Sequence, residues 1–213
     1  MRARQPGATA TDAQDVNWAP LEEFNTFVNI TRTLYVGTRK EWRLWLQDNH
    51  TSNDEIWLIY FRKESGRQSL PYDAAVEEAL CFGWIDSIRK TVDDEKYAQR
   101  FSPRKHGSPY SQTNKERLAC LDNEGKLTEA VKRELKDNRP ENYEIPEDIL
   151  GALKLNEEAW EYFQTTSPSY QRIRAAYVDS ARDRSEEFEK RLDHLIEKSA
   201  QGKQFGYHIE KFY

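Results

Sequence analysis

The sequence has few of the residues on which several structural and catalytic classes depend. Its 213 residues include only two cysteines, Cys81 and Cys120, and nine glycines. Two cysteines cannot form a disulfide framework or a four-ligand metal site, and they fit a reducing, cytoplasmic compartment. No G-x-G-x-x-G, G-K-[ST] or G-x-S-x-G segment occurs. The nucleotide-binding loops and the hydrolase turn that these patterns mark are therefore excluded.

Long apolar segments are also missing. The hydrophobic fraction is 37%, against roughly 45–50% in an average soluble protein. No apolar run approaches the ~18 residues that cross a bilayer, and the N-terminus lacks the apolar stretch of a signal peptide. We therefore expect neither membrane insertion nor secretion. Six Trp, eleven Tyr and nine Phe offset the shortage, because each large ring buries ~150–250 Å².

Charge of one sign does not dominate. The chain has 32 Lys and Arg against 37 Asp and Glu, a net charge of −5, which argues against a nucleic-acid partner. The basic residues of 126–136 alternate with acids, as on a solvated helix face. The histidines have no metal-ligand spacing with Cys, Asp or Glu. The sequence therefore predicts no metal and no cofactor.

The pattern along the chain predicts an α+β fold: a small, mostly antiparallel sheet flanked by helices, followed by an all-helical C-terminal part. We expect a flexible arm over 1–28, an α+β domain over 29–139, a helical domain over 145–202 and an aromatic tail over 203–213. The break between the domains is marked by Pro140 in a polar linker.

Local signals predict the individual elements. In the first part we expect a strand over 31–36, a helix capped by Thr38 and Glu41, a strand over 56–61, a helix from Pro71 to Gly83, and strands over 84–90 and 96–102. In the second part we expect a helix from Ser108-Pro109 to Gly125, a helix over 128–136, and short helices starting at Pro146, Asn156, Ser167 and Ser185. The four aromatics of the tail favour docking onto the body; self-association into a homodimer is the alternative.

Several segments resemble the YdeI/OmpD-associated family, also called bacteriocin-protection proteins. The matching stretches are the EWRLWL run at Glu41, the YDAAVEEALCFGWID run from Tyr72, the RFSPRKHGSPYSQTNK run from Arg100, and, more weakly, IPED at Ile145, the Ala-Trp at Trp160, SPSY at Ser167 and Ser-Ala-Arg at Ser180. Together they extend from Thr33 to Gly202. The sequence departs from the family at Pro109-Tyr110, where an aromatic between two serines is more common. The resemblance implies protection against bacteriocins or antimicrobial peptides, and it brings no reaction or ligand.

A cluster of cations next to a predicted helix start is the most specific site-like feature. Arg100, Arg104 and Lys105 precede the helix predicted from Ser108. Free N–H groups at a helix N-terminus and arginine side chains together attract anions. We therefore expect a small anionic ligand here, with Arg104 as the charge clamp. The further expected contacts are Trp84, Arg100, Ser111, Asn114 and Lys115. A capped helix with a salt-bridged surface is the alternative.

Asp86 is a second candidate. Pleat alternation places it on the same sheet face as Trp84, where an apolar pocket would suit a catalytic acid or base. A carboxylate that only accepts structural hydrogen bonds is the competing interpretation. Cys81 with His106 could form a thiol and base pair, but Cys81 lies beside Leu80 on an apolar helix face, which favours a core role.

Three functions therefore stay open. The leading hypothesis is a cytoplasmic binding protein for a small anionic ligand. The second is an enzyme that uses Asp86 on a small anionic substrate. The third is a protein-interaction module, which an exposed apolar stripe on Trp160, Tyr170 or Tyr177 would favour.

Overall fold

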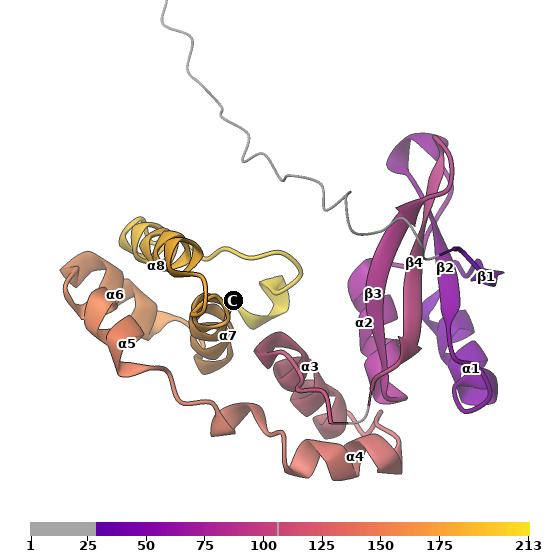
Figure 1. Ribbon diagram of the computed structural model, residues 1–213, viewed down its shortest axis with the longest axis horizontal. Helices are drawn as coiled ribbons and strands as arrows, with labels where there is room; N and C mark the ends of the chain where they lie inside the picture. The colour runs from indigo at the N-terminus through magenta and orange to yellow at the C-terminus, as the bar shows by residue number, and fades with distance from the viewer. Residues whose placement is uncertain (1–28, 106) are drawn as a thin grey trace, which may run out of the picture.

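The computed structural model describes residues 29–105 and 107–213. The arm predicted over 1–28 lies outside these residues, as does His106. Figure 1 shows a sheet with two helices at one end of the molecule and a group of helices at the other. The predicted α+β class with an all-helical C-terminal part is confirmed.

The sheet contains four strands within the described residues, in the order β1-β2-β4-β3. These are β1 (Thr33–Leu34), β2 (Ile56–Phe61), β3 (Trp84–Thr91) and β4 (Lys96–Pro103). β1 runs parallel to β2, and the other neighbours are antiparallel. β1 is shorter than predicted, because only two residue pairs form before the chain turns into the helix cap at Thr38.

Helices α1 (Arg39–Asn49) and α2 (Tyr72–Cys81) pack beside the sheet. The predicted capping box at the start of α1 is confirmed: the Thr38 hydroxyl accepts the Glu41 N–H, and the Glu41 carboxylate accepts the Thr38 N–H. Gly83 follows the C-cap of α2, Phe82, and its φ of +73° is the left-handed conformation expected after a helix. Between helices and sheet lies an aromatic-rich core that includes Trp42, Leu46, Leu80, Trp84 and Phe101.

Helix α3 (Gln112–Asn123) begins later than the sequence predicted. Ser111, not Ser108, is the N-cap, and its hydroxyl accepts the Asn114 N–H at 3.3 Å. The Ser108 carbonyl instead accepts a hydrogen bond from Arg104, and Tyr110 is buried in the intervening turn. The predicted helix start was wrong because these tertiary contacts hold 108–110 outside the helix. α4 (Glu129–Lys136) follows as expected.

Four helices form the C-terminal part: α5 (Glu147–Lys154), α6 (Glu157–Thr165), α7 (Pro168–Asp179) and α8 (Ser185–Ala200). Asn156 caps α6 and Ser167 caps α7, as predicted. Ile149, Leu153, Phe163, Val178 and Leu195 are buried in their shared core. α7 also packs against α3, which joins this part to the first. The domain boundary itself stays a prediction.

The C-terminal segment folds back onto the body. Figure 1 shows it between α3 and the C-terminal helices. Ile209 and Phe212 are buried against Tyr170 and Ile173 of α7. The docking favoured by the sequence is therefore what the structure shows, while a homodimer stays untested.

Candidate functional site

The arginine expected to clamp an anion is held by the chain itself. Arg104 donates from Nη2 to the Glu134 carboxylate at 2.7 Å and from Nη1 to the Ser108 carbonyl. The face of its guanidinium lies 3.9 Å from the centroid of the Tyr110 ring. Its Nε is buried without a hydrogen-bond partner. The charge of Arg104 is thus already compensated, and an anion there would compete with Glu134.

The neighbouring candidates occupy different surroundings. Arg100 donates from Nε to the Glu55 carboxylate at 2.6 Å. Trp84 is only 1% exposed and donates its indole N–H to the His50 carbonyl at 3.0 Å. Trp84 therefore belongs to the hydrophobic core, where it has little surface to offer a ligand.

The three ligand contacts predicted on the following helix also lie in different surroundings. Ser111 is used as the cap of α3, and Lys115 is half-buried. Asn114 is buried and accepts from Nη1 of Arg117 at 3.2 Å. Asn114 thereby joins a second group of charged residues, and the anion site centred on Arg104 stays a prediction.

Asp86 lies near that second group. It is on the helix-covered face of the sheet and accepts a hydrogen bond from the Tyr72 hydroxyl at 2.6 Å. Burial, followed by the Asp86 charge, raises the pKa of Tyr72 well above its ordinary value. The Tyr72 ring in turn packs 4.6 Å from the His208 ring. Asp86 is thus connected, through one tyrosine, to the C-terminal segment.

Asp73, Arg117 and His208 form the centre of the group. The Asp73 carboxylate contacts His208 Nδ1 at 2.9 Å and Arg117 Nη2 at 3.0 Å. Arg117 Nη2 also donates to the His208 carbonyl at 2.7 Å. The three residues come from α2, α3 and the C-terminal segment, so only the folded chain brings them together.

A hollow of about 210 Å³ lies against this centre. It is lined by Asp73, Glu77, Arg117, His208, Glu210 and Lys211. Arg117 is only 6% exposed, and its Nε is buried without a hydrogen-bond partner. His208 has a φ of +60°, the one positive φ of a non-glycine residue in the described ranges. A strained backbone and an unpaired buried donor at one hollow are features of ligand sites.

Sequence reasoning missed this group. Asp73 and His208 are 135 residues apart, so no motif spacing could connect them. In the sequence, His208 has no metal-ligand spacing and no other motif around it. An acid in the first turn of α2 and an arginine within a predicted helix are common features with no special signal. Two of the predicted residues contact this group: Asn114 accepts a hydrogen bond from Arg117, and Asp86 accepts one from Tyr72, whose ring packs on His208.

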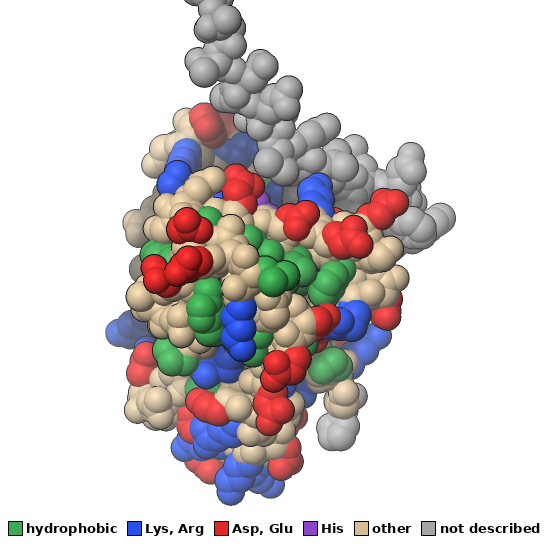
Figure 2. All heavy atoms as spheres, turned by 90° about the vertical axis from the view of Figure 1, so that its left-hand side faces the viewer, with side chains coloured by type: hydrophobic (Ala, Val, Ile, Leu, Met, Phe, Trp, Pro, Cys, Tyr) green, Lys and Arg blue, Asp and Glu red, His purple; other side chains and the backbone are tan. Residues whose placement is uncertain are grey.

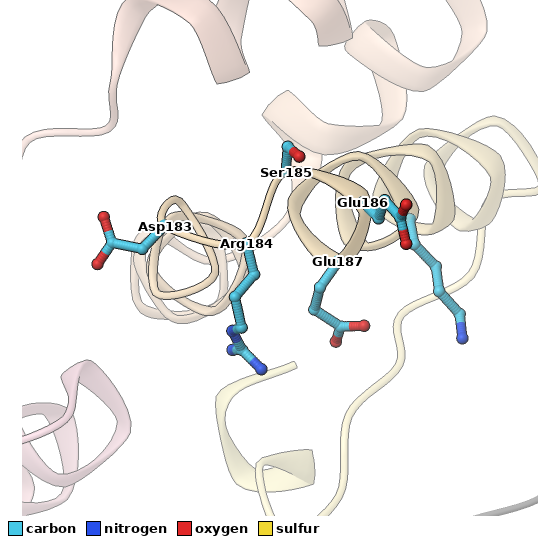
Figure 3. Close-up of a pocket in the computed structure, with 6 residues that line it drawn as sticks. Asp183, Arg184, Ser185, Glu186 and Glu187 are labelled. Carbon is cyan, nitrogen blue, oxygen red and sulfur yellow. The ribbon is translucent and has the colours of Figure 1, made fainter.

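A larger hollow, of about 500 Å³, lies at the start of α8 and has a different character. Its side chains diverge: Asp183 points away from Arg184 and Glu187, and Ser185 points to the opposite side (Figure 3). Three acids and two bases line it. With no converging groups, it offers a ligand little specific recognition.

The structure also bears on the residues of the other two hypotheses, the protein-interaction module and the thiol and base pair. Tyr170 is buried beneath the C-terminal segment and Tyr177 is partly exposed, so they form no joint stripe. Figure 2 shows hydrophobic side chains on the face of the C-terminal helices, bordered by acidic ones. Cys81 is buried, with its thiol pKa raised to about 11 mainly by burial. Its suggested partner His106 lies outside the described residues.

The described part of the chain contains neither a cluster of metal-binding side chains nor a helix that could cross a membrane. No group of three or more His, Cys, Asp or Glu residues there is arranged to hold a metal ion. None of the helices there combines the length and apolar character needed to span a membrane.

Two family models match the chain. Residues 34–134 match a model described as a domain of unknown function, DUF8412. Residues 142–202 match a model described as bacteriocin-protection, YdeI or OmpD-associated. The family predicted from the sequence is thus confirmed over the C-terminal helices, whereas the motifs between 41 and 115 fall within the other model. No curated protein and no solved structure matches the chain.

Proposed function

We propose that the protein, whose residues 142–202 match the model described as bacteriocin-protection, YdeI or OmpD-associated, binds a small anionic ligand in the hollow between α2, α3 and the C-terminal segment. The observation that carries the proposal is the buried Nε of Arg117, which has no hydrogen-bond partner. Leaving such a donor unsatisfied costs about 1–3 kcal/mol, which an oxygen of a ligand would recover.

The charges around the hollow define the ligand more closely. Arg117, Lys211 and His208 lie beside three acids, Asp73, Glu77 and Glu210. An anion alone would meet repulsion from these carboxylates. A ligand with a carboxylate toward Arg117 and a hydroxyl or ammonium group toward the acids would satisfy both signs. Small hydroxy- or amino-carboxylates have this chemistry.

Thermal unfolding with a ligand panel tests the proposal. Lactate and alanine should raise the midpoint more than propionate, the matched acid without a donor group. Saturation at 100 times Kd adds ~2.7 kcal/mol. Arg117→Lys should remove the shift, because an ammonium cannot replace the Nε contact. Arg104→Ala is the control and should keep it.

The other outcomes of this experiment would contradict binding at Arg117. If Arg104→Ala alone removes the shift, the ligand binds at Arg104 as the sequence suggested. If no hydroxy- or amino-carboxylate raises the midpoint of the wild-type chain, or if Arg117→Lys responds as the wild type does, the hollow is not a site for this ligand class.

A second candidate, acid/base chemistry on the bound ligand, is supported by the Asp73–His208 contact. A carboxylate on Nδ1 fixes the imidazole and leaves Nε2 as a base. Asp86 would act through Tyr72, whose ring packs on His208. Once a ligand is found, deuterium exchange at its acidic C–H is the test: His208→Gln should abolish it while binding persists. Exchange at the wild-type rate in this variant would overturn the candidate.

A further inference from the structure

Arg174, on α7, is a buried cation without a counter-ion. It is 6% exposed, and it makes no ion pair or hydrogen bond with any residue in 29–105 or 107–213. Arg117 is equally buried but is bound by Asp73. A buried charge is costly unless it is paired, because protein replaces water around it. The fold therefore maintains a positive charge here that nothing described in the chain neutralises.

Aromatic rings hold this guanidinium in place. Its carbon lies 4.0 Å from the centroid of the Phe205 ring and 4.6 Å from that of Tyr177. A Cβ added at Gly206 would collide with the Ile209 side chain and would lie 3.1 Å from Nη1 of Arg174, so the glycine leaves room for both side chains. Rings attract a cation through their faces but do not cancel its charge. Nε is buried, whereas the terminal nitrogens, also without partners, are not.

A second arginine faces the same tyrosine. The Arg191 guanidinium carbon, from α8, lies 4.0 Å from the Tyr177 centroid. Glu187 binds Arg191 through Nε at 2.6 Å, and the Tyr177 carbonyl accepts from its Nη1 at 2.9 Å. Repulsion from Arg191 adds to burial in lowering the pKa of Arg174. Two guanidiniums thus lie over one ring, and of the two only Arg191 is bound by a carboxylate.

Positive charges in the same region also lower the pKa of His194. The His194 ring lies edge-on to Phe205, with centroids 4.6 Å apart. Partial burial and the charges of Lys198 and Arg174 lower its pKa, and the Glu197 charge opposes them. The charges of Arg174 on α7 and Lys198 on α8 therefore both act on the ring of His194.

We propose that Arg174 and Arg191 form a binding site for an oxyanion, a phosphate group of a small molecule, on the surface formed by α7, α8 and the C-terminal segment. Guanidinium nitrogens bind phosphate oxygens with paired, charge-assisted hydrogen bonds. The exposed edges of Tyr177 and Tyr213 would border the phosphate and contact the rest of the ligand. Arg174 and Arg191 lie within the family-matched residues 142–202, and the site is separate from the hollow at Arg117.

Inorganic phosphate is the probe, compared with sodium chloride at equal ionic strength. Phosphate should raise the unfolding midpoint of the full chain. Arg174→Met keeps the length and the apolar contact with Phe205 but removes the charge, and should weaken phosphate binding roughly ten- to a hundredfold. Without phosphate this variant should be at least as stable as the wild type, because a buried unpaired charge is gone.

Arg182→Met is the matched control. Arg182 also lies over a phenylalanine ring, Phe188, but it is bound by Asp148 and Asp179. This variant should respond to phosphate as the wild type does. Equal stabilisation of Arg174→Met would show that phosphate binds elsewhere, and no stabilisation of the wild type would overturn the proposal.

The NMR titration of His194 gives a readout that does not depend on stability. Phosphate next to Arg174 should raise the pKa of His194 in the wild-type chain and in Arg117→Lys, but not in Arg174→Lys or Arg174→Met. Phosphate that stabilises the chain without moving His194 would place the anion at another site. A shift in Arg174→Lys equal to that of the wild type would exclude the guanidinium as its ligand.

Discussion

Arg104, Arg117 and Arg174 carry the same formal charge but meet different electrostatic surroundings. Arg104 is held by Glu134, and Arg117 by Asp73. Arg174 has aromatic rings around it and no acid. A counter-ion decides whether a guanidinium is available to a ligand, because an acid already bound must be displaced first. The local density of arginines in the sequence points to Arg104, whereas among these three only Arg174 has no acid bound to it in the fold.

The two cysteines should differ in reactivity. Burial raises the pKa of Cys81 to about 11, so at pH 8 its thiol is protonated and shielded. Cys120 is partly exposed, with a pKa raised to a smaller extent, mainly by partial burial. Iodoacetamide at pH 8 should therefore modify Cys120 first, and Cys81 only in urea, as mass spectrometry of the peptides can show. Equal labelling of both in the native chain would contradict the burial of Cys81.

Stability should depend on pH through His194. Its pKa is lowered from 6.5 in the folded chain, by partial burial and by Lys198 and Arg174. The unfolded chain therefore binds a proton more readily, so acidification favours unfolding. The cost is absent well above pH 6.5 and grows as the pH falls toward the folded-state pKa. Between pH 7 and 5, the urea midpoint of the wild type should fall more than that of His194→Gln. Equal falls of the midpoint in the two proteins would contradict a contribution of His194.

At the scale of elements, the contact between α3 and α7 depends on one buried carboxylate. Glu116 is buried and accepts from Arg172 through both oxygens, at 2.7 and 3.0 Å. Gln112 and Ser169 donate to the same carboxylate. Because these groups are satisfied together, the α3–α7 contact has one defined geometry.

Removing that carboxylate should be costly. Glu116→Ala leaves Arg172 without its partner in a largely buried place, and should lower the free energy of unfolding by roughly 3–5 kcal/mol in urea titrations. Asp148→Ala is the control, since it breaks the exposed pair with Arg182, which is worth less than about 1 kcal/mol. Equal losses of unfolding free energy in the two variants would mean that the α3–α7 contact contributes little to stability.

At the scale of the whole molecule, the C-terminal segment connects the two parts of the chain. His208 reaches Asp73 of α2, while Ile209 and Phe212 pack on α7. Both proposed sites use this segment, the hollow through His208 and the phosphate site through Phe205. Docking of 203–213 is therefore a condition for either site.

The anchoring of this segment can be measured. Ile209 is 4% exposed, so Ile209→Ala should cost about 2 kcal/mol or more. It should also speed hydrogen exchange in α3 and α7. Tyr207→Ser, at a residue 88% exposed, should change stability by less than about 0.5 kcal/mol. Exchange that is unchanged in Ile209→Ala would mean that the segment does not stabilise these helices.

Most of the helices and strands, and the resemblance of residues 142–202 to a known family, can be read from the sequence without a structure. The cap at Thr38, the glycine after α2, the alternation in β4 and the caps at Asn156 and Ser167 act over a few residues, and such local preferences are readable without a fold. The start of α3 was misplaced because Arg104 and Tyr110 hold the preceding turn through tertiary contacts. Which charges are paired and which side chains meet could not be read from the sequence, because Asp73, Arg117 and His208 come together from distant parts of the chain. The free-energy cost of each charge depends on how deeply folding buries it and on which groups surround it.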